Sequence, residues 1–105
     1  MVRGEVFRLP APTRAQGREQ RDARYAIVVQ ADDLLGLSTV LVAPTSASAR
    51  PATFRPTIEL LGTRTRVLVE QTTVVDPLRL GDSAGRLDLA EMDAVDAALR
   101  LLLAL

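Results

Sequence analysis

Tyr25–Gln30 has the sequence YAIVVQ, an apolar run between polar residues, and Ser38–Pro44, STVLVAP, is a second run of the same kind. Short runs that are rich in β-branched residues are typical of strands buried on both faces. We therefore expect two central strands here, the second ending at Pro44 because proline cannot donate to a sheet ladder. Arg24 stands at the border between the first run and the charged segment before it.

Patterns on either side of these runs predict the remaining strands. Residues 5–9 (EVFRL) alternate polar and apolar side chains before Pro10, as a half-buried strand does. Residues 54–61 and 66–75 supply two or three more strands, whereas residues 80–87 are short, polar and glycine-punctuated and add no strand to this count. Turns are expected at residues 32–37 and at Asp76-Pro77.

The segment between the first two strands, residues 10–24, is polar, rich in arginine and unusually long for so small a domain. Long surface loops without regular structure usually carry function or move.

The C-terminal residues predict one amphipathic helix from about residue 89 to residue 103. Asp88 and Glu91 have the spacing of a capping box, and Arg100 near the other end suits the helix dipole. Apolar residues recur every three or four positions along one face, at Leu89, Met92, Val95, Leu99 and Leu102. The leucines of residues 101–105 exceed what one stripe can bury, so they either dock on the sheet or form a contact between two copies.

Five or six short strands followed by one helix predict a mainly β, α+β fold, in which a small, strongly bent antiparallel sheet or barrel is covered on one side by the helix. The 105 residues allow one domain, 1–105, with an aliphatic core because aromatic residues make up 3%. We see neither a signal peptide nor an apolar run that could span a membrane, which leads us to expect a cytoplasmic protein.

The chain has no cysteine and no histidine, which argues against structural zinc sites, thiol nucleophiles and serine–histidine relays. Its formal net charge is zero, but residues 1–66 hold ten arginines against six acids and residues 67–105 hold three against seven. All thirteen cations are arginine, which suits bidentate contact with phosphate and equally reflects a GC-rich coding sequence.

Four segments in this order resemble the PemK/MazF-type toxins of bacterial toxin–antitoxin modules. They are RGEVFRLPAPTRAQGREQRDARYAIVVQ, STVLVAPTS, LVEQTTVVDPLRLGDSAGRL and EMDAVDAALRLLLAL, and together they run from Arg3 to Leu105. The resemblance implies an SH3-like barrel with a C-terminal helix, a homodimer, and metal-independent, sequence-selective cleavage of single-stranded RNA without a cofactor. It also implies a cognate antitoxin that lays an acidic C-terminal segment across the RNA groove.

The resemblance assigns site residues in two places. The family motif Gly-Ser-Glu-Gln followed by Arg-Pro corresponds to residues 17–20 (GREQ) and to Arg24-Tyr25, which makes Arg24 catalytic and Glu19 supporting. A second motif, Pro, an apolar residue and then Thr-Ser or Thr-Thr, corresponds to Pro44-Thr45-Ser46 with one residue missing. Register counted from Thr39 favours Ser46 as the catalytic hydroxyl, whereas residue identity favours Thr45.

These side chains suit RNA cleavage by attack of a ribose 2′-OH, which yields a 2′,3′-cyclic phosphate and a 5′-OH end. A fixed guanidinium can donate two hydrogen bonds to the charge that develops on the phosphate. Without histidine, the obvious general base is Glu19. Around this set, four polar residues of the long loop either line the RNA path or form a solvated surface: Arg14, Arg18, Gln20 and Arg21.

Two other functions remain open on the sequence. A gyrase-binding toxin of CcdB type shares the scaffold, but its activity depends on exposed residues near the end of the last helix, where this chain has leucines. A non-catalytic RNA-binding module is the third hypothesis, because one residue is missing from the Pro44-Thr45-Ser46 motif.

Overall fold

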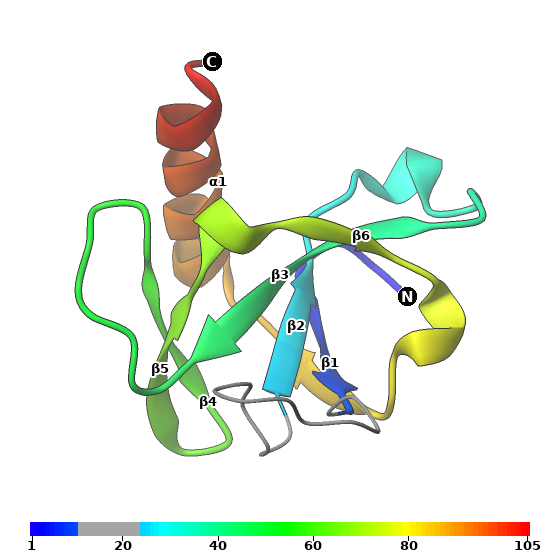
Figure 1. Cartoon of the computed structure of the whole chain (residues 1–105), viewed down its shortest axis with the longest axis horizontal. Coiled ribbons are helices and arrows are strands. Elements are labelled where there is room, and N and C mark those ends of the chain that lie inside the picture. Colours follow the sequence, from blue (N-terminus) through cyan, green and yellow to red (C-terminus); the bar gives the residue numbers. More distant parts are fainter. Residues whose placement is uncertain (11–23) are drawn as a thin grey trace, which may run out of the picture.

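Antiparallel strands curl into a half-barrel, and one helix lies beside it, in the computed structural model, which describes residues 1–10 and 24–105 (Figure 1). The sheet runs in the order β4-β5-β3-β2-β1-β7, and β6 pairs with β3 beside this path. The strands are β1 (Glu5–Leu9), β2 (Arg24–Val28), β3 (Val40–Ser46), β4 (Thr57–Leu60), β5 (Thr63–Val67), β6 (Thr73–Val75) and β7 (Ser83–Arg86). The fold class expected from the sequence, a small barrel-like sheet with a C-terminal helix, is confirmed.

Strand β3 is the centre of the sheet because it pairs with three other strands. One of its edges faces β2, with Ile27 opposite Ala43. Its other edge faces β6 in its first half, with Leu41 opposite Val74, and β5 in its second half, with Thr45 opposite Val67. β3 therefore belongs to both walls of the half-barrel (Figure 1).

The sequence predicted that the strand of residues 38–44 ends at Pro44. This prediction was wrong, because β3 continues to Ser46. The Pro44 carbonyl accepts a hydrogen bond from Leu68 N at 2.8 Å. In an antiparallel strand the nitrogen and the oxygen of one residue point to the same side. The missing N–H of Pro44 therefore faces the gap between β5 and β6, where no ladder bond is required.

Residues 54–75 form three strands, within the two or three expected from the sequence. Residues 66–75 do not form continuous strand, because the 3₁₀ turn η2 (Val69–Gln71) separates β5 from β6. Residues 80–87 contain strand β7, which the sequence did not suggest, and β7 pairs with β1 through a register shift between Val6 and Phe7. Gly85 has φ +120 at this irregularity, a conformation open to glycine. Two more 3₁₀ turns, η1 (Asp32–Leu34) and η3 (Pro77–Arg79), lie where turns were expected.

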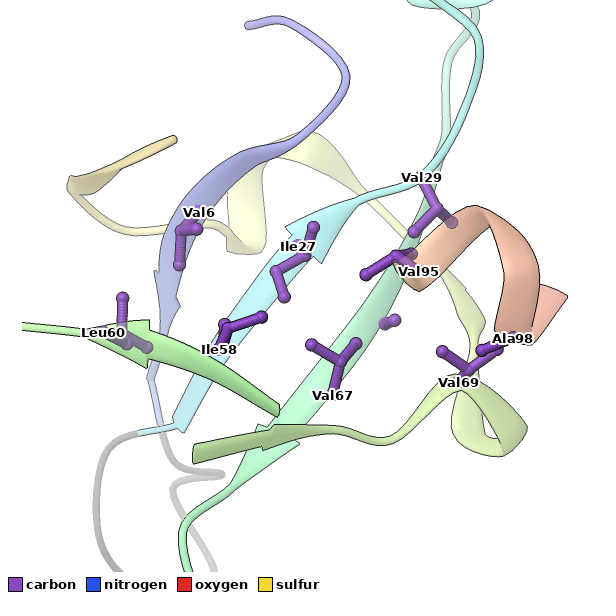
Figure 2. Packing of buried hydrophobic residues seen from close by; sticks show 10 residues of the cluster. Val6, Ile27, Val29, Ile58, Leu60, Val67, Val69, Val95 and Ala98 are labelled. Atoms are coloured by element: carbon purple, nitrogen blue, oxygen red, sulfur yellow. The ribbon is translucent and has the colours of Figure 1, made fainter. Parts of the chain in front are cut away.

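Aliphatic side chains from both walls and from the helix fill the interior (Figure 2). Ile27, Ile58, Val67 and Val95 are almost completely buried in this main cluster. A second cluster on the other side of β2 and β3 contains Ala26, Val28, Val40, Val42 and Val75. The two central strands are thus buried on both faces, as their continuous apolar runs predicted.

The helix α1 (Leu89–Leu103) has the bounds expected from its periodicity. Asp88 and Glu91 form the predicted capping box, in which Asp88 Oδ1 accepts from Glu91 N at 2.7 Å and Glu91 Oε1 accepts from Asp88 N at 3.0 Å. The leucines at the end of the helix do not dock on the sheet of their own chain. Their exposed fractions are 59%, 42%, 58% and 85% at Leu101, Leu102, Leu103 and Leu105.

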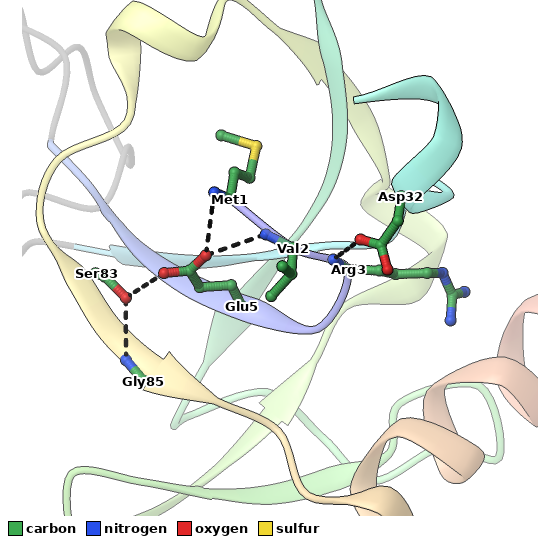
Figure 3. Close-up of polar contacts among 7 residues, drawn as sticks. All are labelled: Met1, Val2, Arg3, Glu5, Asp32, Ser83 and Gly85. Atoms are coloured by element: carbon green, nitrogen blue, oxygen red, sulfur yellow. Dashed lines mark hydrogen bonds and ion pairs between the residues drawn. The ribbon is translucent and has the colours of Figure 1, made fainter. Parts of the chain in front are cut away.

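Polar contacts hold the first residues of the chain against the sheet (Figure 3). Glu5 Oε1 accepts from Val2 N at 3.1 Å, and Glu5 Oε2 accepts from Ser83 Oγ at 2.7 Å. The hydrogen bond from Ser83 lowers the pKa of Glu5 below its ordinary value. Arg3 N donates to Asp32 Oδ1 at 2.6 Å, so this segment joins β1 to β7 and to η1.

An ion pair holds the connection between β3 and β4, residues 47–56. Arg55 Nε and Nη2 both donate to Glu70 Oε2, at 2.9 and 2.6 Å, and Arg55 Nη1 donates to the Arg50 carbonyl at 3.2 Å. Glu70 therefore holds this connection through the side chain of Arg55. Its contact with Arg55 lowers the pKa of Glu70 below its ordinary value.

Replacing Glu70 with Gln should therefore destabilise the protein in a pH-dependent way. A carboxyl whose pKa is lowered by folding stabilises the native state above its unfolded pKa, and this contribution disappears as the pH falls through the folded pKa. Glu70→Gln should lower the free energy of unfolding by about 1 kcal/mol at pH 7, and the difference should be smaller at pH 3. Urea denaturation at both pH values measures this. Glu59→Gln, at an exposed position of β4, is the matched control, and an equal loss in both variants would contradict the assignment.

Candidate functional site

A cavity of about 230 Å³ lies where β2, the end of β3 and the β4–β5 hairpin meet. Its lining includes Arg24 from the start of β2 and Thr45 and Ser46 from the end of β3. The structure thus brings together three of the four residues that the sequence predicted as catalytic. The other described residues of the lining are Tyr25, Ala47, Leu60, Leu61, Thr63 and Thr65.

Strand register explains why Arg24 and Ser46 meet. Ala26 lies opposite Pro44 in the β2–β3 pair, so continuing this register by two residues places Arg24 opposite Ser46. Residues two apart on a strand point to the same face. Arg24 and Ser46 thus share one face of the sheet, and Tyr25 and Thr45 share the other.

The two hydroxyls predicted as alternatives differ in their hydrogen bonds. Thr45 is 5% exposed, and its Oγ1 donates to the Tyr25 carbonyl at 3.2 Å, which ties β3 to β2 beside Arg24. Ser46 is half-buried, and its Oγ accepts from Ser48 N at 3.3 Å and lies 3.3 Å from Ser48 Oγ. A hydroxyl has a single hydrogen to donate. Thr45 would have to rotate that hydrogen away from the Tyr25 carbonyl to reach a ligand, whereas Ser46 keeps its hydrogen free when Ser48 Oγ is the donor in their contact.

A second arginine, which the sequence did not single out, lies beside Ser46. Arg66 on β5 is directly opposite Ser46 on β3. Its Nε donates to the Ala49 carbonyl at 3.2 Å and its Nη1 donates to Thr57 Oγ1 at 2.9 Å. Arg66 therefore holds the segment that follows Ser46, and it adds positive charge on the same face as Arg24.

The hairpin between β4 and β5 forms the outer wall of the cavity. Leu61 and Gly62 connect the strands, and both have positive φ, +52 and +80. This combination is the one required by the tight turn that suits twisted hairpins. Glycine adopts it freely, but for an L-residue it costs roughly 1–2 kcal/mol. Leu61 is also 68% exposed, so hydrophobic burial within this chain offsets little of that strain.

The threonines of β5 were missed in the sequence, although its pattern contained the signal. The strand reads TRTRV, so Thr63, Thr65 and Val67 share the face that points into the half-barrel, and the two arginines share the other. Polar residues at inward positions of a strand mark either a solvated end of the barrel or a binding pocket.

The other predicted site residues lie outside the described residues. These are Glu19, the expected general base, and the four polar loop residues Arg14, Arg18, Gln20 and Arg21. Within residues 1–10 and 24–105, no three acidic side chains converge as ligands of a metal would. None of the helices in this part of the chain has the length and apolar character that a membrane crossing requires.

Solved structures share this fold at low sequence identity. MazF of Deinococcus radiodurans superposes with a TM-score of 0.79 at 22% identity, covering 100% of this chain and 97% of that one. The toxin MazF-mt6 of Mycobacterium tuberculosis gives 0.74 at 18% identity, covering 94% and 97%. An endoribonuclease from a mycobacterial species, solved in complex with its cognate antitoxin, gives 0.79 at 19% identity, covering 100% and 96%.

Sequence comparison identifies the family of the chain in addition to its fold. The protein Rv3098A of Mycobacterium tuberculosis (strain ATCC 25618 / H37Rv), a candidate toxin, is 40% identical over 99 residues, which cover 93% of this chain and 92% of that protein. The family model described as PemK-like, MazF-like toxin of type II toxin–antitoxin system matches residues 2–103. The chain therefore belongs to the PemK-like, MazF-like toxins of type II toxin–antitoxin systems.

Proposed function

We propose that this toxin is an endoribonuclease that cleaves single-stranded RNA in the cytoplasm, without a metal ion, at the cavity lined by Arg24, Thr45 and Ser46. The observation that carries the proposal is the convergence of one guanidinium and two hydroxyls from two neighbouring strands in one cavity. Positioned donors of this kind stabilise charge that develops on a phosphate during the reaction.

Arg24 is the group that stabilises the transition state. Attack of a ribose 2′-OH on the adjacent phosphorus adds negative charge to the non-bridging oxygens, and a guanidinium matches two such oxygens with parallel hydrogen bonds. The start of β2 fixes the backbone of Arg24, and within the described residues no carboxylate forms an ion pair with it. A guanidinium that forms no ion pair within residues 1–10 and 24–105 can bind a phosphodiester.

A second donor comes from one of the two hydroxyls, Thr45 or Ser46. Both residues line the cavity together with Arg24, Ser46 from the same face of the sheet as Arg24 and Thr45 from the opposite face, so either hydroxyl is a candidate donor to the phosphate. The proton of the 2′-OH requires a base, and no carboxylate lies in the described lining of the cavity. Glu19 in the preceding segment therefore stays the predicted base. The products are a 2′,3′-cyclic phosphate and a 5′-OH end.

The regulator in this proposal is a cognate antitoxin with an acidic segment. One of the similar solved structures is an endoribonuclease bound to its cognate antitoxin, and another is a MazE–MazF complex of Deinococcus radiodurans. In this chain Arg24 and Arg66 share the face beside the cavity, which favours an acidic ligand. An antitoxin segment bound there would exclude RNA.

The toxin in this proposal is a homodimer, and the helix end supplies part of the contact. Leu101, Leu103 and Leu105 are each more than half exposed, which leaves a cluster of leucines uncovered at the end of α1. Exposed leucines gathered at one helix end can form an interaction site on a small protein. A second copy would cover it.

Arg24→Ala should lower the rate of RNA cleavage by about 10²–10³-fold, because a single preorganised donor in a transition-state site has this effect. The assay uses purified toxin and a mixed single-stranded RNA in excess EDTA. Arg64→Ala, at an exposed position of β5 that does not line the cavity, is the matched control. Cleavage that requires added metal, or that Arg24→Ala retains in full, would refute the mechanism, and gyrase-dependent DNA breaks with intact RNA would indicate a CcdB-type toxin.

Thr45→Val and Ser46→Ala should separate the two hydroxyls. The variant that lacks the catalytic hydroxyl should have a kcat about 100-fold lower than the wild type, with little change in KM. The kcat of the other variant should stay within about fivefold of the wild type. Single-turnover cleavage of one short RNA measures both. If both variants keep full activity, no hydroxyl of this pair takes part and Arg24 acts without one.

The double variant Leu101→Asp/Leu105→Asp should weaken self-association at least about tenfold, because it places charge in an apolar contact. Sedimentation at several protein concentrations measures the effect, and circular dichroism checks that α1 is retained. Leu89→Asp, at the other end of the helix and as exposed as Leu105, is the control. Unchanged dimerisation in the double variant would place the dimer contact elsewhere.

A further inference from the structure

We propose that the cavity beside Arg24 holds a single nucleobase, that of a nucleotide adjoining the scissile phosphate, and that Thr65 and Leu61 determine which base is accepted. This inference rests on the proposed RNA cleavage, and it names the substrate feature that the same site selects. Two residues of the lining are poorly explained by the stability of the fold, and both are explained by a bound base.

Thr65 is the first of these residues. It is 5% exposed and lies opposite Ile58 on β4, with Val67 two positions further along its own strand, so its neighbours belong to the hydrophobic core. Its side chain lines the cavity, and no group within the described residues forms a hydrogen bond with its hydroxyl. Valine has the same shape and would fit the apolar neighbours of this position, so the fold itself does not require the hydroxyl. The Thr65 hydroxyl, which can both donate and accept a hydrogen bond, is therefore available to a ligand.

Leu61 is the second residue. It has φ +52 in the turn of the β4–β5 hairpin, where asparagine or glycine would relieve the strain, and its side chain is 68% exposed. A bulky residue in this conformation is uncommon and typically occurs at a functional site. Leu61 lines the cavity together with Leu60, so the strained turn supplies an apolar wall that a ligand can cover.

A nucleobase matches the cavity in size and chemistry. The volume of about 230 Å³ is below the ~300–1,000 Å³ of pockets that bind drug-sized ligands, which suits one planar ring system. The ring of Tyr25 and the two leucines offer apolar contact to the faces of a base, and Thr63 and Thr65 offer hydrogen bonds to its edge. Arg24 at the same cavity holds the phosphate, so the base that enters belongs to a nucleotide next to that phosphate.

The test compares base preference in three proteins: wild type, Thr65→Val and Leu61→Asn. Each cleaves a random single-stranded RNA pool, and the cut ends are sequenced. Thr65→Val should lose about tenfold or more of the discrimination at one position next to the cut, because the hydrogen bond that separates the bases is gone, while it remains as stable as the wild type. Leu61→Asn should raise Tm by about 4 °C and weaken cleavage at the preferred sequence. Thr73→Val, an exposed strand threonine outside the cavity, is the control.

Three outcomes would overturn the inference. An unchanged base preference in Thr65→Val would show that its hydroxyl reads no base. An equal loss at every sequence would assign Thr65 to the chemical step, and an unchanged profile with weaker binding of a synthetic acidic antitoxin peptide would assign the cavity to a protein partner. If Leu61→Asn dissociates the dimer, Leu61 contacts a second copy and not a base.

A binding measurement separates failure of this inference from failure of the proposed cleavage. The four nucleoside 3′-monophosphates and inorganic phosphate are titrated into the isotope-labelled protein and followed by NMR at Tyr25, Leu61 and Thr65. One nucleotide should bind at least about fivefold more tightly than the other three in the wild type, and Thr65→Val should abolish the difference. Preference without cleavage would refute the nuclease and keep the base site, whereas equal binding of all four nucleotides and phosphate would refute the base site alone.

Discussion

The pairing of β3 with three strands is the constraint on which the rest of the molecule depends. Its first half pairs with β2 and β6, and its second half pairs with β2 and β5. Because one strand belongs to both walls, the sheet must bend where the partner changes, at Pro44. The bend encloses the main hydrophobic cluster on one side and leaves the end of β3 at the rim of the half-barrel. Thr45 and Ser46 are polar because they lie at that rim.

The cavity owes its composition to this position. A strand that leaves the core gradually presents first buried and then partly exposed residues, so a hydroxyl at residue 45 can be held by the Tyr25 carbonyl while its neighbour reaches solvent. The start of β2 runs alongside, so Arg24 arrives at the same rim. No loop conformation is needed to place these three side chains. Backbone pairing positions them, and elements of regular structure hold a site more precisely than loops do.

Sequence patterns predicted the elements whose signals are local. The runs at residues 25–30 and 38–44, the capping box of Asp88 and Glu91, and the 3.6-residue period of α1 each specify structure without reference to distant residues. They failed where the outcome depended on a partner strand. Pro44 was expected to end its strand, but its missing N–H faces η2, and β7 forms because β1 offers a free edge despite the glycine at residue 85. The family motif pointed to Arg24, Thr45 and Ser46, whereas Arg66 emerged from the register of β5 against β3 and Thr65 from its place in the cavity lining.

A strained leucine and a buried threonine on one hairpin are best understood as a trade between stability and recognition. Asparagine would relieve the strain of the turn, and valine would fit the strand equally well. Proteins tolerate such losses because the stability that remains is sufficient, and selection then acts on the site. The same hairpin carries two arginines on its outer face, of which Arg66 holds the segment after Ser46. The two faces of β5 thus have different roles. The inner face lines the cavity, and the outer face places positive charge at the rim of the cavity.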